Sequence, residues 1–180
     1  MKIIIGIFDR ILMKLKRIYW KNLLSYQIGQ KLENCTVLGR VEVYATNVKI
    51  GKNITFYPGT MLWGDGVISI GDNVDIGKNT ILYAKMGGGI VIGDNTSIAA
   101  QCFIIDSDHK VEKNILIQKQ GMSTEKITIG KDVWIAANCT ILKGAIISDG
   151  AVIGAKSLVK GFCEKDMIYV GIPAKKLKQR

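Results

Sequence analysis

The sequence predicts an all-β solenoid, in which a short strand and a tight corner repeat along one axis. A helix needs a period near 3.6 residues and a single strand a period of about 2, so a period of six indicates a strand plus a corner, repeated. The residue after the apolar position is often Gly or Ala, and the fourth position is rich in Asn and Gly. The most regular series of apolar, β-branched residues is Ile129, Ile135, Ile141, Ile147, Ile153 and Val159.

The other hexad positions support this interpretation. Asn and Gly tolerate the left-handed backbone angles of a tight corner. We expect such corners at Asn47, Asn53, Gly59, Asn73, Asn79, Asn95, Asn138, Gly144 and Gly150. Further apolar series, in other frames, are Leu38, Tyr44, Ile50, Phe56 and Leu62; Ile70, Ile76 and Leu82; and Ile92, Ile98 and Ile104.

The fifth hexad position is small or branched, and it precedes the next large apolar residue by two. Side chains two apart on a strand share a face, so both should point inward. Three of the four cysteines, Cys102, Cys139 and Cys163, fall on this position. We therefore interpret them as core residues and not as nucleophiles.

Composition excludes several classes of protein. The chain has 180 residues, of which 48% are hydrophobic, so it can bury a core and is not globally disordered. The four cysteines form no CxxC pair, which argues against a zinc finger or a disulfide framework. The longest apolar run, Ile3–Phe8, is too short to span a bilayer. No cleavage site follows it, so we expect a cytoplasmic protein.

The positive charge is concentrated at the N-terminus. Residues 1–31 hold seven basic residues and one acid, and so contribute +6 of the net charge of +10. The main body is therefore not a basic surface for nucleic acid. Apolar residues at steps of three and four predict an amphipathic helix over roughly 3–26. Two interpretations remain open: a cap that docks on the solenoid, or attachment to an anionic membrane surface.

The repeat breaks in two places. Ile104 and Ile129 are 25 residues apart, which is not a multiple of six, so we expect a loop over about 106–126 to leave the solenoid. This loop carries His109, the single histidine. A smaller break spans 83–89 and contains three consecutive glycines. We therefore divide the chain into an N-terminal cap (1–31), a solenoid (32–164) and a basic tail (165–180), which we expect to end in a helix.

Particular motifs resemble a known family. They are VWIAAN at 133–138, Gly144, IGA at 153–155 and GIPAK at 171–175. Residues 32–180 resemble the hexapeptide-repeat acyltransferases, most closely the sugar O-acetyltransferases of the maltose/galactoside and polysaccharide-modifying types. The resemblance implies a left-handed parallel β-helix and a homotrimer with active sites between neighbouring subunits. It also implies acetyl-CoA as co-substrate, a sugar or polysaccharide unit as acceptor, and no metal.

The resemblance also assigns the chemistry. A sugar hydroxyl is a weak nucleophile until a base removes its proton, and histidine suits this task because its ordinary pKa lies near neutrality. His109 matches the family's catalytic histidine. Asp106, in preference to Asp108, is the candidate acid that orients the imidazole. Both acids remain open to interpretation as solvated loop residues.

The remaining site residues are also predicted. Residues 18 apart should stack in a coil of three hexads, which places Ala137, Ala155 and Pro173 on one edge. The resemblance implies that this edge holds the pantetheine arm of acetyl-CoA. The full set of predicted cofactor-binding residues is Trp134, Ala137, Ala155, Lys160, Gly161, Lys175 and Lys178. Tyr83 and Lys85, in the smaller break, are the candidates for acceptor binding.

Three functions compete. The first is O-acetylation of a sugar by direct transfer, probably the last step to be named but the one the motifs favour most. The second is N-acetylation of an amino-sugar nucleotide, and the third is a non-catalytic solenoid scaffold. The same solenoid serves γ-class carbonic anhydrases, but their zinc needs three histidines. A chain with one histidine does not supply that set.

Overall fold

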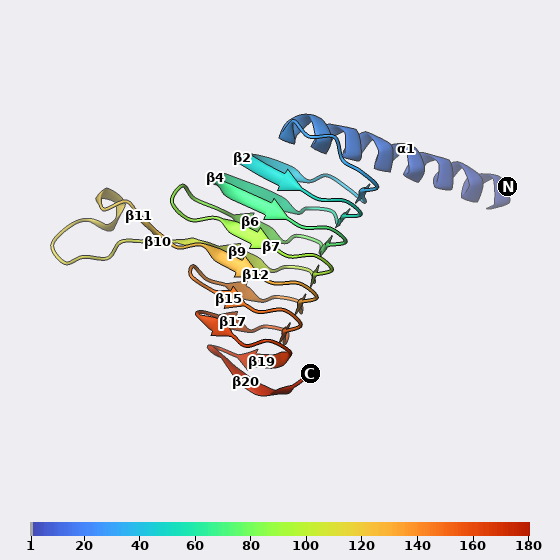
Figure 1. Cartoon of the computed structure of the whole chain (residues 1–180). Helices are drawn as coiled ribbons and strands as arrows, with labels where there is room; N and C mark the ends of the chain where they lie inside the picture. Colours follow the sequence, from blue (N-terminus) through green and yellow to red (C-terminus); the bar gives the residue numbers. More distant parts are fainter. Residues whose placement is uncertain (1) are drawn as a thin grey trace.

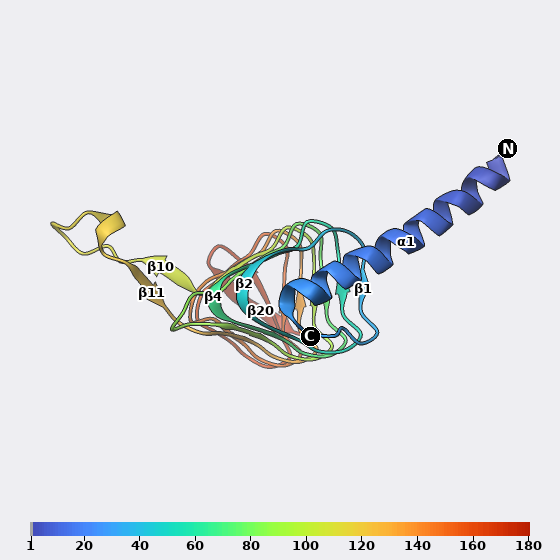
Figure 2. The same ribbon diagram turned by 90° about the horizontal axis from the view of Figure 1, so that it is seen from above.

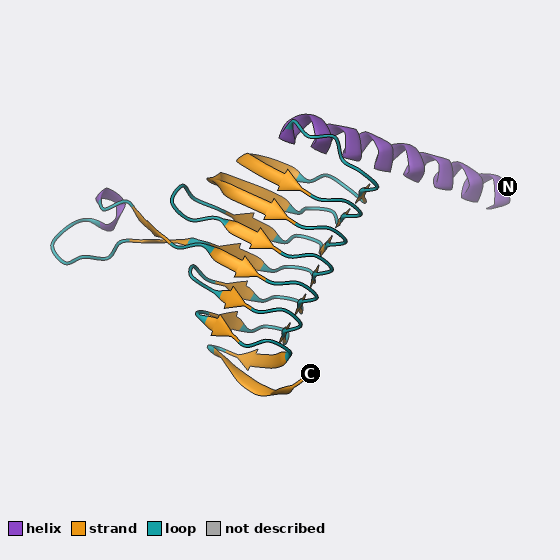
Figure 3. Ribbon diagram, in the orientation of Figure 1, coloured by secondary structure: helices purple, strands orange, loops and turns teal. Residues whose placement is uncertain are grey.

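A computed structural model describes residues 2–180, with side chains from residue 5 onward. Ile4, the first apolar position of the predicted helix, therefore lies outside the described side chains. The chain forms one helix, α1 (Lys2–Ile28), followed by a left-handed parallel β-helix of about seven turns. Figures 1 and 3 show the turns stacked as a prism, as the hexad period predicts.

Two sheets form the three sides of the prism. The first sheet covers one side. In stacking order it contains β1 (Thr36–Val37), β3 (Thr55–Phe56), β5 (Asp75–Ile76), β8 (Ser97–Ile98), β13 (Trp134–Ile135), β16 (Val152–Ile153), β19 (Met167–Gly171) and β20 (Ala174–Gln179).

The second sheet bends around a corner and covers the other two sides. Its long strand β4 (Met61–Ile70) pairs with β6 (Ile81–Tyr83) at its start and with β7 (Ile90–Ile92) at its end. The other strands are β2 (Glu42–Ile50), β9 (Phe103–Ile105), β12 (Ile127–Ile129), β14 (Thr140–Ile141), β15 (Ile146–Ile147), β17 (Leu158–Val159) and β18 (Phe162–Cys163).

Two corners of the prism matter below. The hairpin corner is the bend within the second sheet, at residues 64–66, 84–89, 106–126, 142–145 and 160–161. The small-residue corner joins the first sheet to the next strand, at residues 77–80, 99–102, 136–139 and 154–157. Both predicted breaks in the repeat fall on the hairpin corner, and Figure 2 shows the larger one projecting from the side of the prism away from β1.

The projecting segment is an antiparallel hairpin. Its strands are β10 (Ser107–His109) and β11 (Met122–Thr124), and a short 3-10 helix, η1 (Ile117–Lys119), lies near its tip. The side chain of Gln120 closes the tip by accepting from the Glu112 amide at 2.7 Å and donating to the Ile115 carbonyl at 2.7 Å.

The predicted core and corners are largely confirmed. Every residue of the series from Ile129 to Val159 is at most 1% exposed. All predicted corner residues except Asn47 adopt a positive φ. All four cysteines are buried and free, and burial raises the pKa of the Cys163 thiol to about 11. This agrees with their interpretation as core residues.

The predicted frame of the first turn is wrong. Leu38 and Tyr44 were expected to point inward, but Val37 is 1% exposed and Tyr44 is 59% exposed. The register of β2 against β4 shifts between Ala45 and Asn47. This bulge adds one residue and brings Ile50 back into the core frame, and it explains why Asn47 lies in a strand and not at a corner.

The last turn is shorter than predicted. Cys163 pairs in register with Ile147, so it occupies a large apolar position and not the small one. Ile153 pairs with Tyr169, which is 16 residues later and not 18. Pro173 therefore does not stack on Ala155 as the spacing had suggested.

The C-terminal helix that we predicted is wrong. Residues 174–179 form β20, which pairs antiparallel with β19 and covers the last strand edge. Although Lys, Leu and Gln favour a helix, an open edge offers a row of unpaired backbone groups, and pairing with it overrides local propensity. Tyr169 anchors the hairpin, because it is 6% exposed and its hydroxyl accepts from the Glu164 amide at 2.9 Å.

The last turns of α1 cover the opposite end of the solenoid. Leu24 is 1% exposed, and Trp20 and Ile28 pack against the same core. Gln30, just after the helix, accepts from the Ile50 amide at 3.0 Å and donates to the Ile50 carbonyl. Within the described chain, α1 is not apolar enough to cross a bilayer.

Candidate active site

His109 is held on the projecting hairpin. It pairs with Met122 in the last register position of the two strands, and its side chain is exposed. Neighbouring side chains on a strand point to opposite faces, so Asp108 and His109 face different ways. The hairpin thus presents the chain's single histidine outside the solenoid, where a second substrate or another copy of the chain has access to it.

Asp106 lies at the base of the hairpin and is fully buried. Its carboxylate accepts from the Lys85 amide at 2.9 Å and from the Gly89 amide at 2.5 Å. Burial raises the pKa of this carboxyl, an effect that these two amides oppose. A Cβ on Gly88 would lie 2.3 Å from Oδ2 of Asp106, so only glycine fits there. Within one chain, Asp106 therefore holds the glycine-rich loop 84–89.

We expect Asp106→Ala to destabilise the protein by about 3 kcal/mol, because it leaves two amides without their charged acceptor. Urea unfolding measures the loss, and hydrogen exchange should accelerate at the Lys85 and Gly89 amides. Asp108→Ala is the matched control, since an exposed ion pair contributes at most about 1 kcal/mol. Equal losses in the two variants would contradict the assigned role of Asp106.

Asp108 has a different partner. Its carboxylate lies 3.3 Å from Nζ of Lys143, which also donates to Ser123 Oγ at 2.9 Å. Lys143 thereby ties both strands of the hairpin to the next turn of the solenoid. Among the described residues, neither Asp106 nor Asp108 forms a hydrogen bond with His109.

The two candidate acceptor residues lie on the same corner. Tyr83 ends β6 and stacks on Trp63, with ring centroids 5.0 Å apart. Lys85 follows two residues later, and its Nζ lies 3.5 Å from Asp65 Oδ2. The structure thus brings Tyr83 and Lys85 to the corner from which the His109 hairpin projects.

Sequence reasoning missed three residues of this corner: Trp63, Asp65 and Lys143. Asp65 Oδ1 accepts from the Met86 amide at 2.8 Å and so shapes the same loop as Asp106. A signal was present, because all three lie just after an inward residue of the hexad series, at the point where Tyr83 and Lys85 also lie. Comparing that position across turns would have identified them.

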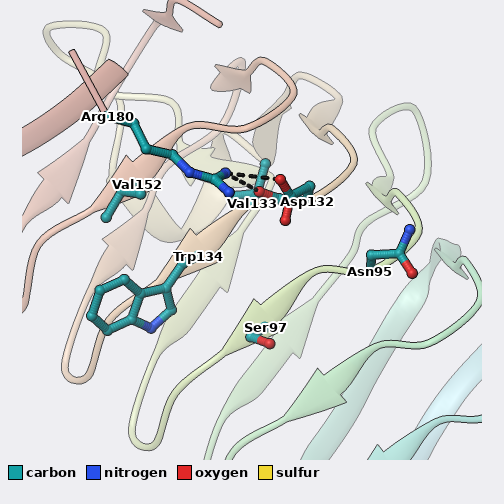
Figure 4. Close-up of a pocket in the computed structure, with 7 residues that line it drawn as sticks. All are labelled: Asn95, Ser97, Asp132, Val133, Trp134, Val152 and Arg180. Carbon is teal, nitrogen blue, oxygen red and sulfur yellow. Dashed lines mark hydrogen bonds and ion pairs between the residues drawn. The ribbon is translucent and has the colours of Figure 1, made fainter. Parts of the chain in front are cut away.

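Trp134 lies on a different side of the prism. It belongs to β13 in the first sheet and is 53% exposed. Figure 4 shows its indole beside a hollow of about 360 Å³ that also contains Arg180, whose Nη1 lies 2.8 Å from Asp132 Oδ2. The hollow is lined by Asn95, Ser97, Asp132, Val133, Trp134, Val152 and Arg180.

The predicted pantetheine edge is the small-residue corner. Ala137 and Ala155 stack there, since the Lys156 amide donates to the Ala137 carbonyl at 2.9 Å. A hollow of about 290 Å³ follows the preceding turns of this corner, with Lys78, Ala100 and Trp134 in its lining. Small side chains keep this edge open, as the sequence predicts.

The other predicted cofactor-binding residues divide between two places. Lys175 and Lys178 lie on β20, exposed at the end of the first sheet, near the small-residue corner. Lys160 and Gly161 lie instead on the hairpin corner, where the Gly161 carbonyl accepts from the Ile146 amide at 3.0 Å. A single chain therefore does not bring all seven predicted residues together.

Comparison with known proteins agrees with this architecture. The family model described as bacterial transferase hexapeptide (six repeats) matches residues 126–161, and that of the hexapeptide repeat of succinyl-transferase matches residues 67–104. WbbJ of Escherichia coli K12, provisionally named a lipopolysaccharide biosynthesis O-acetyl transferase, is 33% identical over 81% of this chain and 80% of its own.

Two further relatives carry a different acceptor in their names. The dTDP-4-amino-4,6-dideoxy-D-glucose acyltransferase of Escherichia coli is 29% identical over 82% of this chain and 80% of its own. The crystal structure of AntD, an N-acyltransferase from Bacillus cereus in complex with dTDP and 3-hydroxybutyryl-CoA, superposes with a TM-score of 0.77. It is 25% identical and covers 88% of this chain and 87% of AntD. The chain therefore belongs to the bacterial hexapeptide-repeat acyltransferases.

Proposed function

We propose that this protein transfers an acetyl group from acetyl-CoA to a hydroxyl group of a sugar, with His109 as general base. The observation that carries the proposal is the placement of the single histidine, exposed on a hairpin beside Tyr83 and Lys85. The relative WbbJ, whose name specifies an O-acetyl transferase, supports the choice of a hydroxyl.

His109 acts in two steps of a direct transfer. Its imidazole accepts the hydroxyl proton while the sugar oxygen attacks the thioester carbon, and a tetrahedral oxyanion forms. The carbon–sulfur bond then breaks, and the imidazolium returns the proton to the departing CoA sulfur. The products are the sugar ester and free CoA. Because no acyl-enzyme forms in this scheme, the buried cysteines have no part in it.

We propose that each site lies between two copies of the chain in a homotrimer. The hairpin corner supplies His109, Tyr83, Lys85, Lys160 and Gly161 from one copy. The small-residue corner and first sheet of a neighbour supply Trp134, Ala137, Ala155, Lys175 and Lys178. This division supports the proposal, because the two groups lie on different corners of one prism yet must reach the same thioester.

The hairpin tip gives independent support. Val111, Ile115, Leu116 and Ile117 are between 50% and 75% exposed. Apolar side chains clustered on a projecting segment are typical of an interaction surface. A neighbouring copy that covers this tip would also fix the position of His109, which makes no hydrogen bond within the described part of one chain.

N-acetylation of an amino-sugar nucleotide is the second candidate. The similarity to AntD and to the dTDP-amino-sugar acyltransferase favours it. The same base and the same cofactor edge serve an amine, because an amine also loses a proton as the amide forms. The two candidates differ only in the atom of the acceptor that attacks.

The test combines binding and turnover. Calorimetry with acetyl-CoA should show binding, and a panel of oligosaccharides and nucleotide sugars should release free thiol. The sharpest pair is a nucleotide sugar with a hydroxyl and its counterpart with an amine at the same carbon. An alkali-labile ester supports O-acetylation, and an alkali-stable amide supports the second candidate. Failure to bind acetyl-CoA would overturn both and leave a scaffold.

A further inference from the structure

Helix α1 has two apolar stripes on nearly opposite sides. The inner stripe is Trp20, Leu24 and Ile28, spaced four residues apart, and it docks on the end of the solenoid. The outer stripe is spaced by three and four residues. Its members Phe8, Ile11, Leu15 and Ile18 are 66%, 55%, 59% and 50% exposed. At about 100° per residue, the centre of the outer stripe lies about 160° from Leu24.

The outer stripe has no partner within the described chain. Every residue from 5 to 19 is exposed, and Figures 1 and 2 show this part of α1 extending beyond the solenoid. The docking of Leu24 also turns the outer stripe away from the prism. The broad apolar face is therefore not the face that caps the solenoid.

The charge on this helix is almost entirely positive. Between residues 5 and 19 the basic residues are Arg10, Lys14, Lys16 and Arg17, and the acid is Asp9. Lys14 and Lys16 flank the two sides of the apolar stripe, at about 100° from its centre. Long basic side chains at that position reach an anionic surface while the apolar face is buried.

We infer that the protein attaches to an anionic lipid bilayer through residues 5–19 of α1. The helix would lie in the plane of the interface, with Phe8, Ile11, Leu15 and Ile18 among the acyl chains and the basic residues at the headgroups. The solenoid, and with it the hairpin corner, would then be held close to the membrane. This inference is independent of the acceptor and of the reaction proposed above.

A second copy of α1 fits the same surface less well. A coiled-coil seam is a narrow a/d stripe whose flanks carry charges of both signs. Here the apolar residues from Phe8 to Tyr19 cover roughly 160° of the helix, and the flanks are basic on both sides. Parallel association of copies would bring these like charges together, whereas an anionic bilayer neutralises them.

The test is sedimentation of the full-length protein with lipid vesicles. Phosphatidylcholine vesicles with about a third phosphatidylglycerol should bind the protein, and pure phosphatidylcholine should bind it far less. Arg10→Gln/Lys14→Gln/Arg17→Gln should weaken binding about 100-fold. Phe8→Ser/Ile11→Ser should weaken it at least about tenfold.

Matched controls come from the solenoid. Phe162 is 63% exposed, like Phe8 at 66%, so Phe162→Ser should leave binding unchanged. Lys49→Gln/Lys126→Gln/Lys165→Gln should do the same, because these basic residues lie outside α1. The altered positions of α1 do not touch the solenoid, and thermal unfolding should confirm that the variants are folded.

Three results would overturn the inference. The first is absence of wild-type binding to the anionic vesicles. The second is equal binding to neutral and anionic vesicles, which removes the electrostatic part. The third is a change of molecular mass in the Phe8→Ser/Ile11→Ser variant without a change in vesicle binding, which would assign the stripe to contact between copies.

Discussion

His109→Ala is expected to slow acetyl transfer by a factor of about 10² to 10⁴, the usual contribution of a positioned general base. Acetyl-CoA binding should persist, since the residues predicted to hold it lie on other elements. Initial rates of thiol release measure the first effect, and calorimetry with acetyl-CoA measures the second. This combination separates a lost proton acceptor from a collapsed site.

Lys113→Ala provides the control for this experiment. Lys113 is exposed in the loop of the same hairpin, so its replacement tests whether any change to the hairpin slows the reaction. We expect rates close to wild type. If His109→Ala kept its rate within about tenfold of wild type, general-base catalysis by His109 would be ruled out.

The sequence predicts most of this fold because the restraints are local. An inward residue every six positions and an Asn or Gly at each corner are enough to define a turn, and both are visible in the letters alone. The failures occur where a turn departs from 18 residues. The bulge between Ala45 and Asn47 lengthens the first turn, and the pairing of Ile153 with Tyr169 shortens the last.

The C-terminal strand was missed for a related reason. Residues 174–179 have helix-forming side chains, and the structure overrides them by offering an unpaired strand edge. That edge exists only once the preceding turns have stacked. Local propensity carries no information about it.

The site is less visible in the sequence than the fold. His109 stands out because it lies where the repeat fails. The role of Asp106 does not, because its partners are the backbone amides of Lys85 and Gly89, and a backbone group has no letter of its own. A carboxylate near a histidine in sequence suggested an orienting acid. The structure shows it holding a loop 17 to 21 residues away in the chain.

The second large effect concerns the proposed site between copies, and it is a gain of activity. His109→Ala removes the base from the hairpin corner. Ala155→Trp should block the small-residue corner, because Ala155 is exposed there and a large side chain would fill the edge. Each variant alone should be nearly inactive, while Ala155→Ser, which is close to alanine in size, should retain activity.

Co-expression of the two inactive variants with different tags should restore function. In a ring of three, any trimer that contains both variants has one interface with an intact hairpin facing an intact edge, so trimers carrying both tags should recover about a third of wild-type activity. A site contained within one chain predicts no recovery, because no chain then holds both intact parts. The division of the predicted residues between two corners of the prism favours the first result. Only an arrangement in which one copy's hairpin reaches its neighbour's edge brings His109 and the small-residue corner to the same thioester.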